Sequence, residues 1–434
     1  MTRESLASWL AKIESCHPKD IELGLSRIAT VAARLQLSLA ASHVITVAGT
    51  NGKGSSVASI ERLLLSEGKT VGCYTSPHFI HYNERIRLQG KSIDDQSLVD
   101  AFEQIELARQ NTQLTYFEYG TLAALLIFQK QTPDVVVLEV GLGGRLDATN
   151  IIDADIAIVN SIALDHEDWL GSDLEIIGRE KAGIFRSNSW AISADPSVPE
   201  SVKAVANACG ARLLSRGCEF DLIEGRGQIT WCGINAKGVK RSIALPTMPH
   251  LPIDSVVAAI QAVSLLFDQP IGDQAITDLV HCQLTGRFEC LEYANKTIIL
   301  DVAHNPAAAE HLATRIHNQY SQQVCYAVFA AMVDKDVTGV VSAMSATIDY
   351  WHVSALSKVS RAMSCRELES VLSAQHIHDY QAYSSPEEAI AMALSRMQDN
   401  DILIIFGSFF TVAAAKLWLS AQPAVHSVQQ RGGL

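Results

Sequence analysis

Short runs of β-branched residues alternate with longer amphipathic helical patterns along most of the 434-residue chain. This alternation predicts parallel sheets covered by helices, so we expect an α/β fold. Several runs are apolar at consecutive positions, which is typical of strands that are buried on both faces. The clearest predicted strands are 43–48, 135–140, 156–160, 298–302, 324–330 and 402–406.

The same pattern predicts two domains. Between residues 219 and 245, short polar–apolar alternations broken by glycine indicate a small antiparallel excursion. The strand–helix alternation restarts at Ile298 and continues to Leu419, which is long enough for a second α/β domain of five or six strands. We therefore expect a first domain over 1–294 and a smaller one over 295–434. The last dozen residues carry no periodic apolar signal and are expected to be frayed.

Composition is typical of a globular protein. Apolar residues make up 48% of the chain and charged residues 19%, which excludes collagen-like and solvated low-complexity classes. The formal net charge is −13, which disfavours binding to nucleic acid or to an anionic membrane. Any anionic ligand must therefore be held by a local site.

Cysteine usage and the chain start favour a cytoplasmic protein. The nine cysteines are an odd number without a C-x-x-C pair, which predicts reduced thiols. The first 15 residues lack the apolar core of a signal peptide and are typical of an amphipathic helix. The uncharged stretch 402–415 is too short to span a bilayer.

A glycine-rich loop follows the first predicted strand. The glycines of segment 49–54 allow backbone N–H groups to approach phosphate oxygens, and a helix predicted to begin near Ser55 adds its partial positive charge. Lys53 can neutralise a β- or γ-phosphate. The spacing departs from the usual phosphate-loop pattern, because Val47 replaces the first glycine and Gly54 follows the lysine. A glycine turn without a ligand is the alternative.

Glu139 interrupts an otherwise apolar strand just before its C-terminal end. A buried carboxylate is costly unless it is paired or metal-bound. Ligands of open α/β sheets bind beyond the carboxyl ends of the strands, where Glu139 and the glycine loop would meet. Mg²⁺ on a nucleotide is the natural partner, and a buried ion pair with an arginine is the alternative.

His166 and Lys181 are ambiguous when they are considered alone. His166 lies in D-H-E-D after the strand 156–160, and Lys181 lies among small residues in R-E-K-A-G-I. A structural hydrogen bond explains such a histidine equally well, and a solvated helix face explains such a lysine.

Several motifs occur together and in order. They are G-T-N-G-K-G-S at 49–55, S-P-H at 76–78, T-Y-F-E-Y-G-T at 115–121, L-E-V-G-L-G-G-R-L-D-A-T-N at 138–150, D-H at 165–166, R-E-K-A-G-I at 179–184, G-R-F at 286–288 and D-V-A-H-N-P at 301–306. On these motifs the chain closely resembles the folylpolyglutamate synthases, and most closely their bifunctional form that is also dihydrofolate synthase. These enzymes belong with the Mur ligases among the ATP-dependent amide ligases, and the resemblance covers essentially the whole chain.

The resemblance implies both a fold and an activity. The fold is an N-terminal P-loop-type, mostly parallel sheet domain with helices on both faces, followed by a smaller C-terminal Rossmann-like α/β domain. The activity is ATP-dependent addition of L-glutamate to dihydropteroate and to reduced folates, through an acyl phosphate, with release of ADP and phosphate. The implied cofactors are ATP, two Mg²⁺ ions and a carbamate on Lys181. A monomer is expected, with small-molecule substrates as its partners.

Three alternatives remain for the activity. They are a folylpolyglutamate synthase without dihydrofolate synthase activity, a Mur-type ligase of peptidoglycan precursors, and an ATP-gated binding protein without catalysis. T-Y-F-E-Y-G-T and the glycine after Lys53 disfavour the Mur-type ligase. A binding protein would be expected to have lost Glu139, His166 or Lys181, and all three are present.

The resemblance also implies roles for individual residues. The implied ATP phosphate contacts are Thr50, Asn51, Gly52, Lys53, Gly54 and Ser55, and the implied metal ligands are Ser76, Glu139, His166 and Lys181. Further nucleotide contacts are Arg287 and Asp301, while Lys53, Lys181 and His304 are the implied catalytic residues. Pteroate is expected at Leu23, Gly24, Leu25, Thr115, Tyr116, Phe117, Glu118, Leu146, Asp147 and Ala148.

The chain departs from the family pattern at two places. The family usually has an asparagine on the helix before G-R-F that contacts the nucleotide, whereas this chain has Asp254 and Ser255 near that position. We assign Ser255 to the ATP site. Near the C-terminus, Phe410 replaces a histidine or tyrosine that is common in relatives, and we assign it no role.

Overall fold

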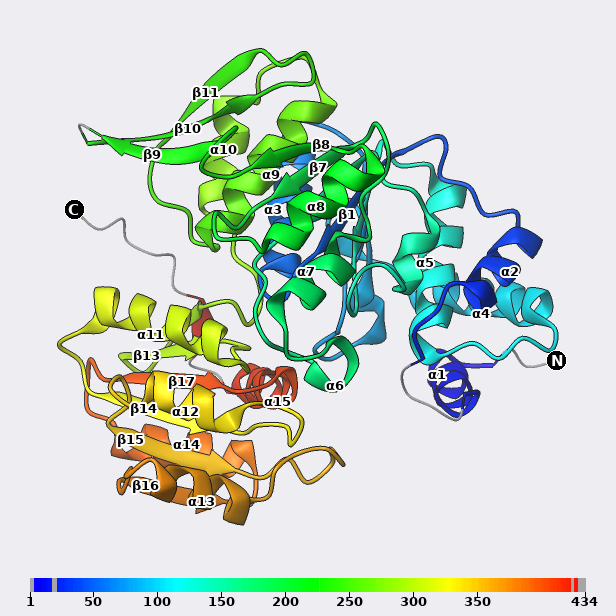
Figure 1. Cartoon of the computed structure of the whole chain (residues 1–434). Coiled ribbons are helices and arrows are strands. Elements are labelled where there is room, and N and C mark those ends of the chain that lie inside the picture. The colour runs from blue at the N-terminus through cyan, green and yellow to red at the C-terminus, as the bar shows by residue number, and fades with distance from the viewer. Residues whose placement is uncertain (1–3, 18–21, 226, 423–424, 428–434) are drawn as a thin grey trace. The chain divides into compact units, whose positions relative to one another are not determined.

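The computed structural model describes residues 4–17, 22–225, 227–422 and 425–427 (Figure 1). The chain divides into two compact units, Met1–Cys282 and Gln283–Leu434. The division lies before the boundary expected at 294/295. Strand β12 (Glu289–Tyr293) pairs along its length with β13 (Lys296–Leu300), so residues 289–293 belong to the second unit's sheet.

The first unit is built on an eight-stranded sheet in the order β4-β3-β2-β5-β1-β6-β7-β8. The six strands from β2 to β8 in this order are parallel, and β3 and β4 form an antiparallel edge beside β2. The predicted strands at 43–48, 135–140 and 156–160 are confirmed. The strands are β1 (His43–Ala48), β2 (Val71–Tyr74), β3 (Ile86–Leu88), β4 (Lys91–Ser92), β5 (Val135–Glu139), β6 (Ile156–Val159), β7 (Trp190–Ser193) and β8 (Arg212–Ser215).

Helices cover both faces of this sheet, as the sequence predicts (Figure 1). On one face α3 packs on β1, β2 and β5, and α9 and α10 pack against α3. On the other face, α4, α5 and α8 share a large apolar cluster with β5, β6 and β7. The helices are α1 (Leu6–Ser15), α2 (Ser26–Arg34), α3 (Lys53–Ser66), α4 (Asp95–Arg109), α5 (Tyr116–Gln131), α6 (Glu167–Leu170), α7 (Leu174–Ala182), α8 (Glu200–Cys209), α9 (Ile253–Leu266) and α10 (Asp273–Val280), with 3₁₀ turns η1 (Tyr82–Arg85) and η2 (Ala148–Ile151).

The antiparallel excursion is a separate three-stranded sheet in the order β11-β10-β9. It consists of β9 (Asp221–Gly225), β10 (Gln228–Ile234) and β11 (Lys240–Leu245). Trp231 is fully buried beneath this sheet. A Cβ at Gly233 would lie 2.2 Å from the Trp231 ring, so the ring requires glycine at this position.

The second unit contains a seven-stranded sheet in the order β16-β15-β14-β17-β13-β12-β18. It exceeds the five or six strands expected, because β12 and β18 add an antiparallel edge to five parallel strands. Strand β18 lies within the segment expected to be frayed, whose last residues, 428–434, lie outside the described part. The further elements are β14 (Cys325–Phe329), β15 (Tyr350–Ser354), β16 (Tyr380–Tyr383), β17 (Ile402–Phe406), β18 (Val425–Ser427), α11 (Pro306–Tyr320), α12 (Val337–Met344), α13 (Cys365–Ala374), α14 (Pro386–Arg396) and α15 (Phe409–Ser420).

Strand order determines where a ligand site forms in the first unit. After β1, the chain passes through α3 to β2, which is two positions away in the sheet. Strand β5 later fills the position between β2 and β1, and β6 pairs with the other side of β1. The loops that follow β1, β5 and β6 therefore start at the same edge of the sheet. Such a reversal of strand order is where open α/β sheets bind ligands.

Two expectations from composition can be compared with the structure. All nine cysteines are free thiols. In the described part of the chain, no helix has the length and apolar character needed to cross a membrane.

Candidate functional site

The glycine loop connects β1 to α3 and is fixed to the loop that follows β6. Thr50 N–H donates to Ser161 O at 2.7 Å, and Thr50 Oγ1 exchanges two 3.0 Å hydrogen bonds with the backbone of Ala163. Gly49 has φ +147°, and a Cβ there would lie 2.7 Å from Asn160 Cβ. The loop therefore requires glycine at residue 49 both for its backbone conformation and for space.

Helix α3 begins at Lys53, two residues earlier than expected, with Gly52 at the N-cap and φ +85°. Among the described residues, no side chain caps this end of the helix, and an uncapped helix N-terminus is a common binding site for anions. Lys53 Nζ donates to Gly49 O at 2.9 Å and to Thr50 O at 3.1 Å. The lysine charge is thus held over the loop itself.

The two candidates for the family's missing asparagine have different surroundings. Ser255, on α9, is buried, and its Oγ donates to Gly52 O at 3.1 Å. Asp254 is directed elsewhere and forms an ion pair with Arg216. Of these two residues, Ser255 therefore contacts the glycine loop, whereas Asp254 pairs with Arg216.

Glu139 is the last residue of β5 and is only 5% exposed. Its backbone pairs with Val47 on β1, and its Oε2 accepts a hydrogen bond from Ser76 N–H at 3.2 Å. Two of the expected metal ligands, Ser76 and Glu139, are therefore adjacent.

Lys181 lies near the end of α7 and is 4% exposed. Burial and, to a smaller extent, the Lys53 charge lower the pKa of its amine to about 7, although the Asp165 and Asp147 charges oppose the change. His166 follows Asp165 and is linked to it by a 2.9 Å hydrogen bond from the His166 N–H. Lys181, Lys53 and Asp165 thus lie within electrostatic reach of one another.

The loop after β5 is organised by Asp147. Its carboxylate accepts N–H groups from Gly141 at 3.0 Å and Leu142 at 2.9 Å, as well as the N–H and hydroxyl of Thr149. Burial raises the pKa of this carboxyl, and these donors oppose the rise. The donors compensate a charge that the interior would otherwise disfavour.

The three segments expected to bind pteroate are brought together by this loop. Gly24 N–H donates to Leu146 O at 3.3 Å, and a Cβ at Gly141 would lie 2.6 Å from the Phe117 ring. Thr115 caps α5 in a reciprocal capping box with Glu118. Residues 23–25, 115–118 and 146–148 therefore form one region.

The expected residues of the second unit also form a cluster. Asp301 accepts N–H groups from Phe288 and Ala303, both at 2.8 Å, and burial raises the pKa of its carboxyl while the Arg287 charge opposes the rise. His304 Nδ1 lies 2.7 Å from Val302 O, so this nitrogen carries the proton. Arg287 lies just before β12, whereas Asp301 and His304 follow β13. The hairpin of β12 and β13 therefore connects the three residues.

Phe409 contributes to this cluster and was not predicted. The Arg287 guanidinium lies 5.4 Å from the Phe409 ring centre, and the His304 ring centre lies 6.4 Å from it. Phe410, the neighbour that the sequence singled out, is 47% exposed. Consecutive residues at the start of a helix point in different directions, so the motif alone does not reveal which of the two phenylalanines faces the site.

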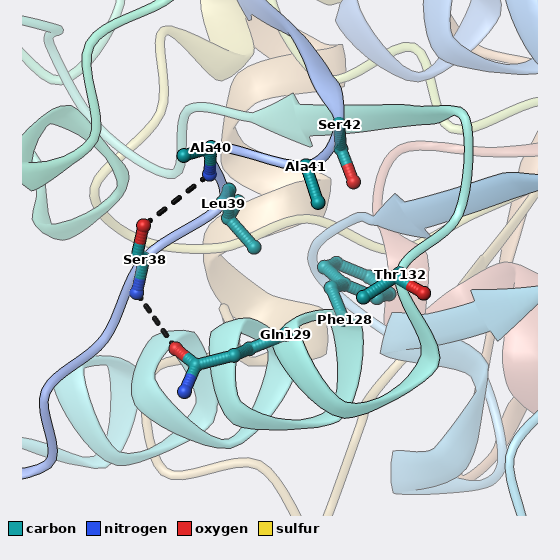
Figure 2. A pocket seen from close by; sticks show the side chains of 8 residues that line it. All are labelled: Ser38, Leu39, Ala40, Ala41, Ser42, Phe128, Gln129 and Thr132. Atoms are coloured by element: carbon teal, nitrogen blue, oxygen red, sulfur yellow. Dashed lines mark hydrogen bonds between the residues drawn. The ribbon is translucent and has the colours of Figure 1, made fainter.

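A pocket of about 310 Å³ lies elsewhere on the first unit (Figure 2). It is lined by residues 38–42, which precede β1, together with Phe128, Gln129 and Thr132. Ser38 N–H donates to Gln129 Oε1 at 2.6 Å. The pocket is at the amino end of β1, opposite to the glycine loop, and none of the described residues that line it is ionisable.

Comparison with known proteins identifies the family. The Mur ligase middle domain matches residues 47–219, and the Mur ligase glutamate ligase domain matches residues 286–409. The dihydrofolate synthase/folylpolyglutamate synthase of Escherichia coli is 42% identical over 412 residues, which cover 94% of each chain. The chain belongs to the dihydrofolate synthase/folylpolyglutamate synthase family.

Solved structures of this family have the same fold. The Escherichia coli FolC complex with DHPP and ADP superimposes with a TM-score of 0.89 at 40% identity and covers 96% of this chain and 98% of its own. The Yersinia pestis bifunctional enzyme complexed with AMPPNP and Mn ion gives a TM-score of 0.87 at 40% identity, with the same coverage. Both the resemblance inferred from the motifs and the predicted fold class are confirmed.

The predicted metal ligands are not a cluster of acidic side chains. In the described part of the chain, no three His, Cys, Asp or Glu side chains are arranged to hold a metal by themselves. The predicted set contains only two such residues, Glu139 and His166, and draws its other ligands from Ser76 and Lys181. Asp165, which the D-H motif contains, was assigned no role from the sequence.

Proposed function

We propose that the protein is an ATP-dependent ligase that adds L-glutamate to dihydropteroate, giving dihydrofolate, and to reduced folates, giving polyglutamates. The observation that carries this proposal is the arrangement of Lys53, Glu139 and Lys181 at one edge of the sheet in a chain 42% identical to a bifunctional relative. A phosphate cation, a buried carboxylate and a buried amine are the groups that such chemistry needs.

The glycine loop is proposed to hold the ATP phosphates. Thr50 to Ser55 include the uncapped N-terminus of α3, and the Lys53 ammonium would release the loop carbonyls to contact a β- or γ-phosphate. Ser255 supports the loop through Gly52 O. Transfer of the γ-phosphoryl group to the acceptor carboxylate spreads negative charge that these donors stabilise.

The residues present fit a magnesium site. Glu139 supplies a buried carboxylate, and Ser76, whose N–H donates to it, would supply a hydroxyl oxygen; His166 and a modified Lys181 would complete the ligand set. When bound, Mg²⁺ would neutralise phosphate charge on ATP. Within the chain itself, the Ser76 N–H orients Glu139, and Asp165 orients the loop that carries His166.

Lys181 is proposed to act as a carbamate. The ammonium first loses one proton; the neutral amine then adds to CO₂, forming an N–C bond and releasing a second proton, so that a cation is replaced by an anion with two oxygens. Burial beside Lys53 favours the neutral amine that this reaction requires. The carbamate oxygens are of the hard type that Mg²⁺ prefers, whereas an ammonium has no lone pair to offer.

The acceptor is proposed to bind across residues 23–25, 115–118 and 146–148, with Tyr116 and Phe117 supplying aromatic surface for a pterin or aminobenzoyl ring. In the second unit, Arg287 and Asp301 are proposed to contact the nucleotide. Because His304 carries its proton on Nδ1, its Nε2 is the basic atom, and we propose that it accepts a proton from the incoming glutamate ammonium. The amine then attacks the acyl phosphate, and phosphate leaves.

The decisive experiment is glutamate-dependent ADP release by the purified protein with Mg·ATP. We expect turnover with dihydropteroate and with tetrahydrofolate when each is supplied alone. Turnover with tetrahydrofolate only would reduce the proposal to a folylpolyglutamate synthase. Turnover only with a peptidoglycan precursor would establish the Mur-type ligase instead. We further propose that the enzyme acts in the cytoplasm and that it is a monomer. Light scattering on the purified protein would check the monomeric state.

A further inference from the structure

Arg85 is a buried cation whose partners are neutral. It ends the 3₁₀ turn η1 and is 9% exposed. Its Nε donates to His78 Nδ1 at 2.8 Å, and its guanidinium carbon lies 5.2 Å from the Tyr82 ring centre and 5.6 Å from the Tyr116 ring centre. No carboxylate in the described ranges forms an ion pair with it.

Two arginines of the first unit that are more exposed than Arg85 are nevertheless paired with carboxylates. Arg27 contacts Glu22 and Glu118, and Arg87 contacts Glu61. A buried charge is costly unless it is paired, and cation–π contacts offset only part of that cost. The environment of Arg85 therefore indicates an anionic partner that the chain itself does not provide.

Arg85 lies between two parts of the proposed site. Its carbonyl accepts the N–H of Thr75 at 2.8 Å, and Thr75 directly precedes Ser76, a proposed metal ligand. Its guanidinium lies beside the ring of Tyr116, which belongs to the proposed acceptor region. An anion that pairs with Arg85 would thus be carried by the acceptor, close to the carboxylate that is activated.

The two proposed acceptors differ in their carboxylates. Dihydropteroate has a single carboxylate, which is the group that receives the phosphoryl group. A folate ends in glutamate, so that its γ-carboxylate is activated while its α-carboxylate remains an anion. We propose that Arg85 binds the α-carboxylate of the terminal glutamate of folate acceptors, and is thereby the residue that adapts the site to chain extension. This inference depends on the proposed function.

The test compares the two acceptors on variants of Arg85. Arg85→Met removes the charge and keeps an apolar stem, whereas Arg85→Lys keeps the charge without the planar fork. We expect Arg85→Met to lower kcat/KM for tetrahydrofolate at least about tenfold relative to dihydropteroate, as expected for loss of a charge-assisted hydrogen bond. Arg85→Lys should recover part of this ratio. Arg212→Met, which removes an exposed arginine that lies over the Trp190 ring, is the matched control and should leave the ratio unchanged.

A modified acceptor tests the same contact from the substrate side. Tetrahydropteroyl-isoglutamine keeps the γ-carboxylate but carries an α-carboxamide. The unsubstituted protein should discriminate against it by about the factor that Arg85→Met loses with tetrahydrofolate, and Arg85→Met should treat both acceptors alike.

Two results would overturn the inference while leaving the proposed function intact. One is an equal loss with dihydropteroate and tetrahydrofolate, which would indicate a contact to the shared pterin or aminobenzoyl group or a structural role. The other is undiminished discrimination between the carboxylate and carboxamide acceptors in Arg85→Met. If the unsubstituted protein used neither acceptor, the proposed function would itself be wrong, and the inference would be wrong with it.

Discussion

Arg87 on β3, which is partly exposed, forms an ion pair with the buried Glu61 on α3, with Nη2 at 2.7 Å and Nε at 3.0 Å from Glu61 Oε2. The same guanidinium donates through Nη1 to Thr75 Oγ1 at 3.0 Å. It therefore joins the helix that follows the glycine loop to the residue before Ser76. One side chain holds the phosphate and metal parts of the proposed site in register.

Removing only one charge of this pair should destabilise the first unit. Arg87→Met leaves Glu61 buried without its partner, and such changes reduce the free energy of unfolding by about 3–5 kcal/mol. The double variant Arg87→Met, Glu61→Met should recover most of the loss, because neither charge is then buried alone. Urea unfolding of the three proteins measures this. If the double variant were as unstable as the single one, the ion pair would not be the cause.

Glu139→Gln should abolish most activity without unfolding the protein. It keeps the shape of the side chain but removes the charge that is proposed to hold Mg²⁺, which should cost on the order of 3 kcal/mol or about a hundredfold in rate. Mn²⁺ affinity, measured by electron paramagnetic resonance, should fall as well. His166→Ala should be milder, because water replaces a neutral ligand more readily than a charge.

The matched control for Glu139→Gln is Glu224→Gln, which changes an exposed carboxylate on β9. It should leave both turnover and Mn²⁺ affinity unchanged. A folded Glu139→Gln protein with normal turnover would exclude the metal role.

Lys181→Ala should be inactive and partly rescued by acetate rather than by an alkylamine, because the missing group is proposed to be a carboxylate. With the pKa of the amine lowered to about 7, the neutral form becomes scarce below pH 7. Activity in CO₂-depleted buffer should therefore fall with decreasing pH and should be restored by added bicarbonate. Rescue by amines alone, or an unmodified lysine in a well-ordered Mg·ATP-bound crystal, would refute the carbamate.

His352 on β15 should make the second unit sensitive to acid. Burial and, to a smaller extent, the charge of Arg396 on α14 lower the pKa of its imidazole to about 4. The His352 ring lies between Tyr326 and Tyr383. Between about pH 6.5 and 4 the unfolded chain binds a proton that the folded chain does not, so the free energy of unfolding falls as pH decreases.

The slope for His352 is at most about 1.4 kcal/mol per pH unit. The variant His352→Phe keeps a ring against Tyr383. It should flatten the pH dependence of the second unit's urea unfolding between about pH 6.5 and 4. An identical pH dependence in the variant would show that His352 is not responsible.

The sequence predicts those parts of the fold that depend on local pattern. The β-branched runs identify the central strands because a strand buried on both faces must be apolar at successive positions. Strands β12 and β18 were missed, since β18 is three residues long and depends on pairing with Tyr293 and its neighbours rather than on its own pattern. Helix α3 begins at Lys53, before its expected start, with Gly52 at the N-cap in a positive-φ conformation that glycine permits and that helix propensity does not reveal.

The candidate site was predictable where motifs carry it, at Lys53, Glu139 and Lys181. The side chains that support these motifs were not predictable, because their partners are distant in sequence. Arg87 pairs with Glu61 across 26 residues, and Ser255 contacts Gly52 across 203. The choice between Asp254 and Ser255 depends on which face of α9 is directed toward the loop, and this is determined by packing.

The close approach of Gly49 and Asn160 has a consequence for how this sequence can vary. A side chain at 49 would collide with Asn160, while the Asn160 amide exchanges hydrogen bonds of 2.8 and 3.1 Å with Ser56 Oγ on α3. Only glycine at 160 would remove the atom that such a side chain meets, and it would also leave the buried Ser56 hydroxyl without the Asn160 amide, while the positive φ at 49 would still disfavour any side chain there. Residues 49, 56 and 160, which are spread over more than a hundred residues, are therefore constrained together. We expect them to vary only jointly and not by single substitutions.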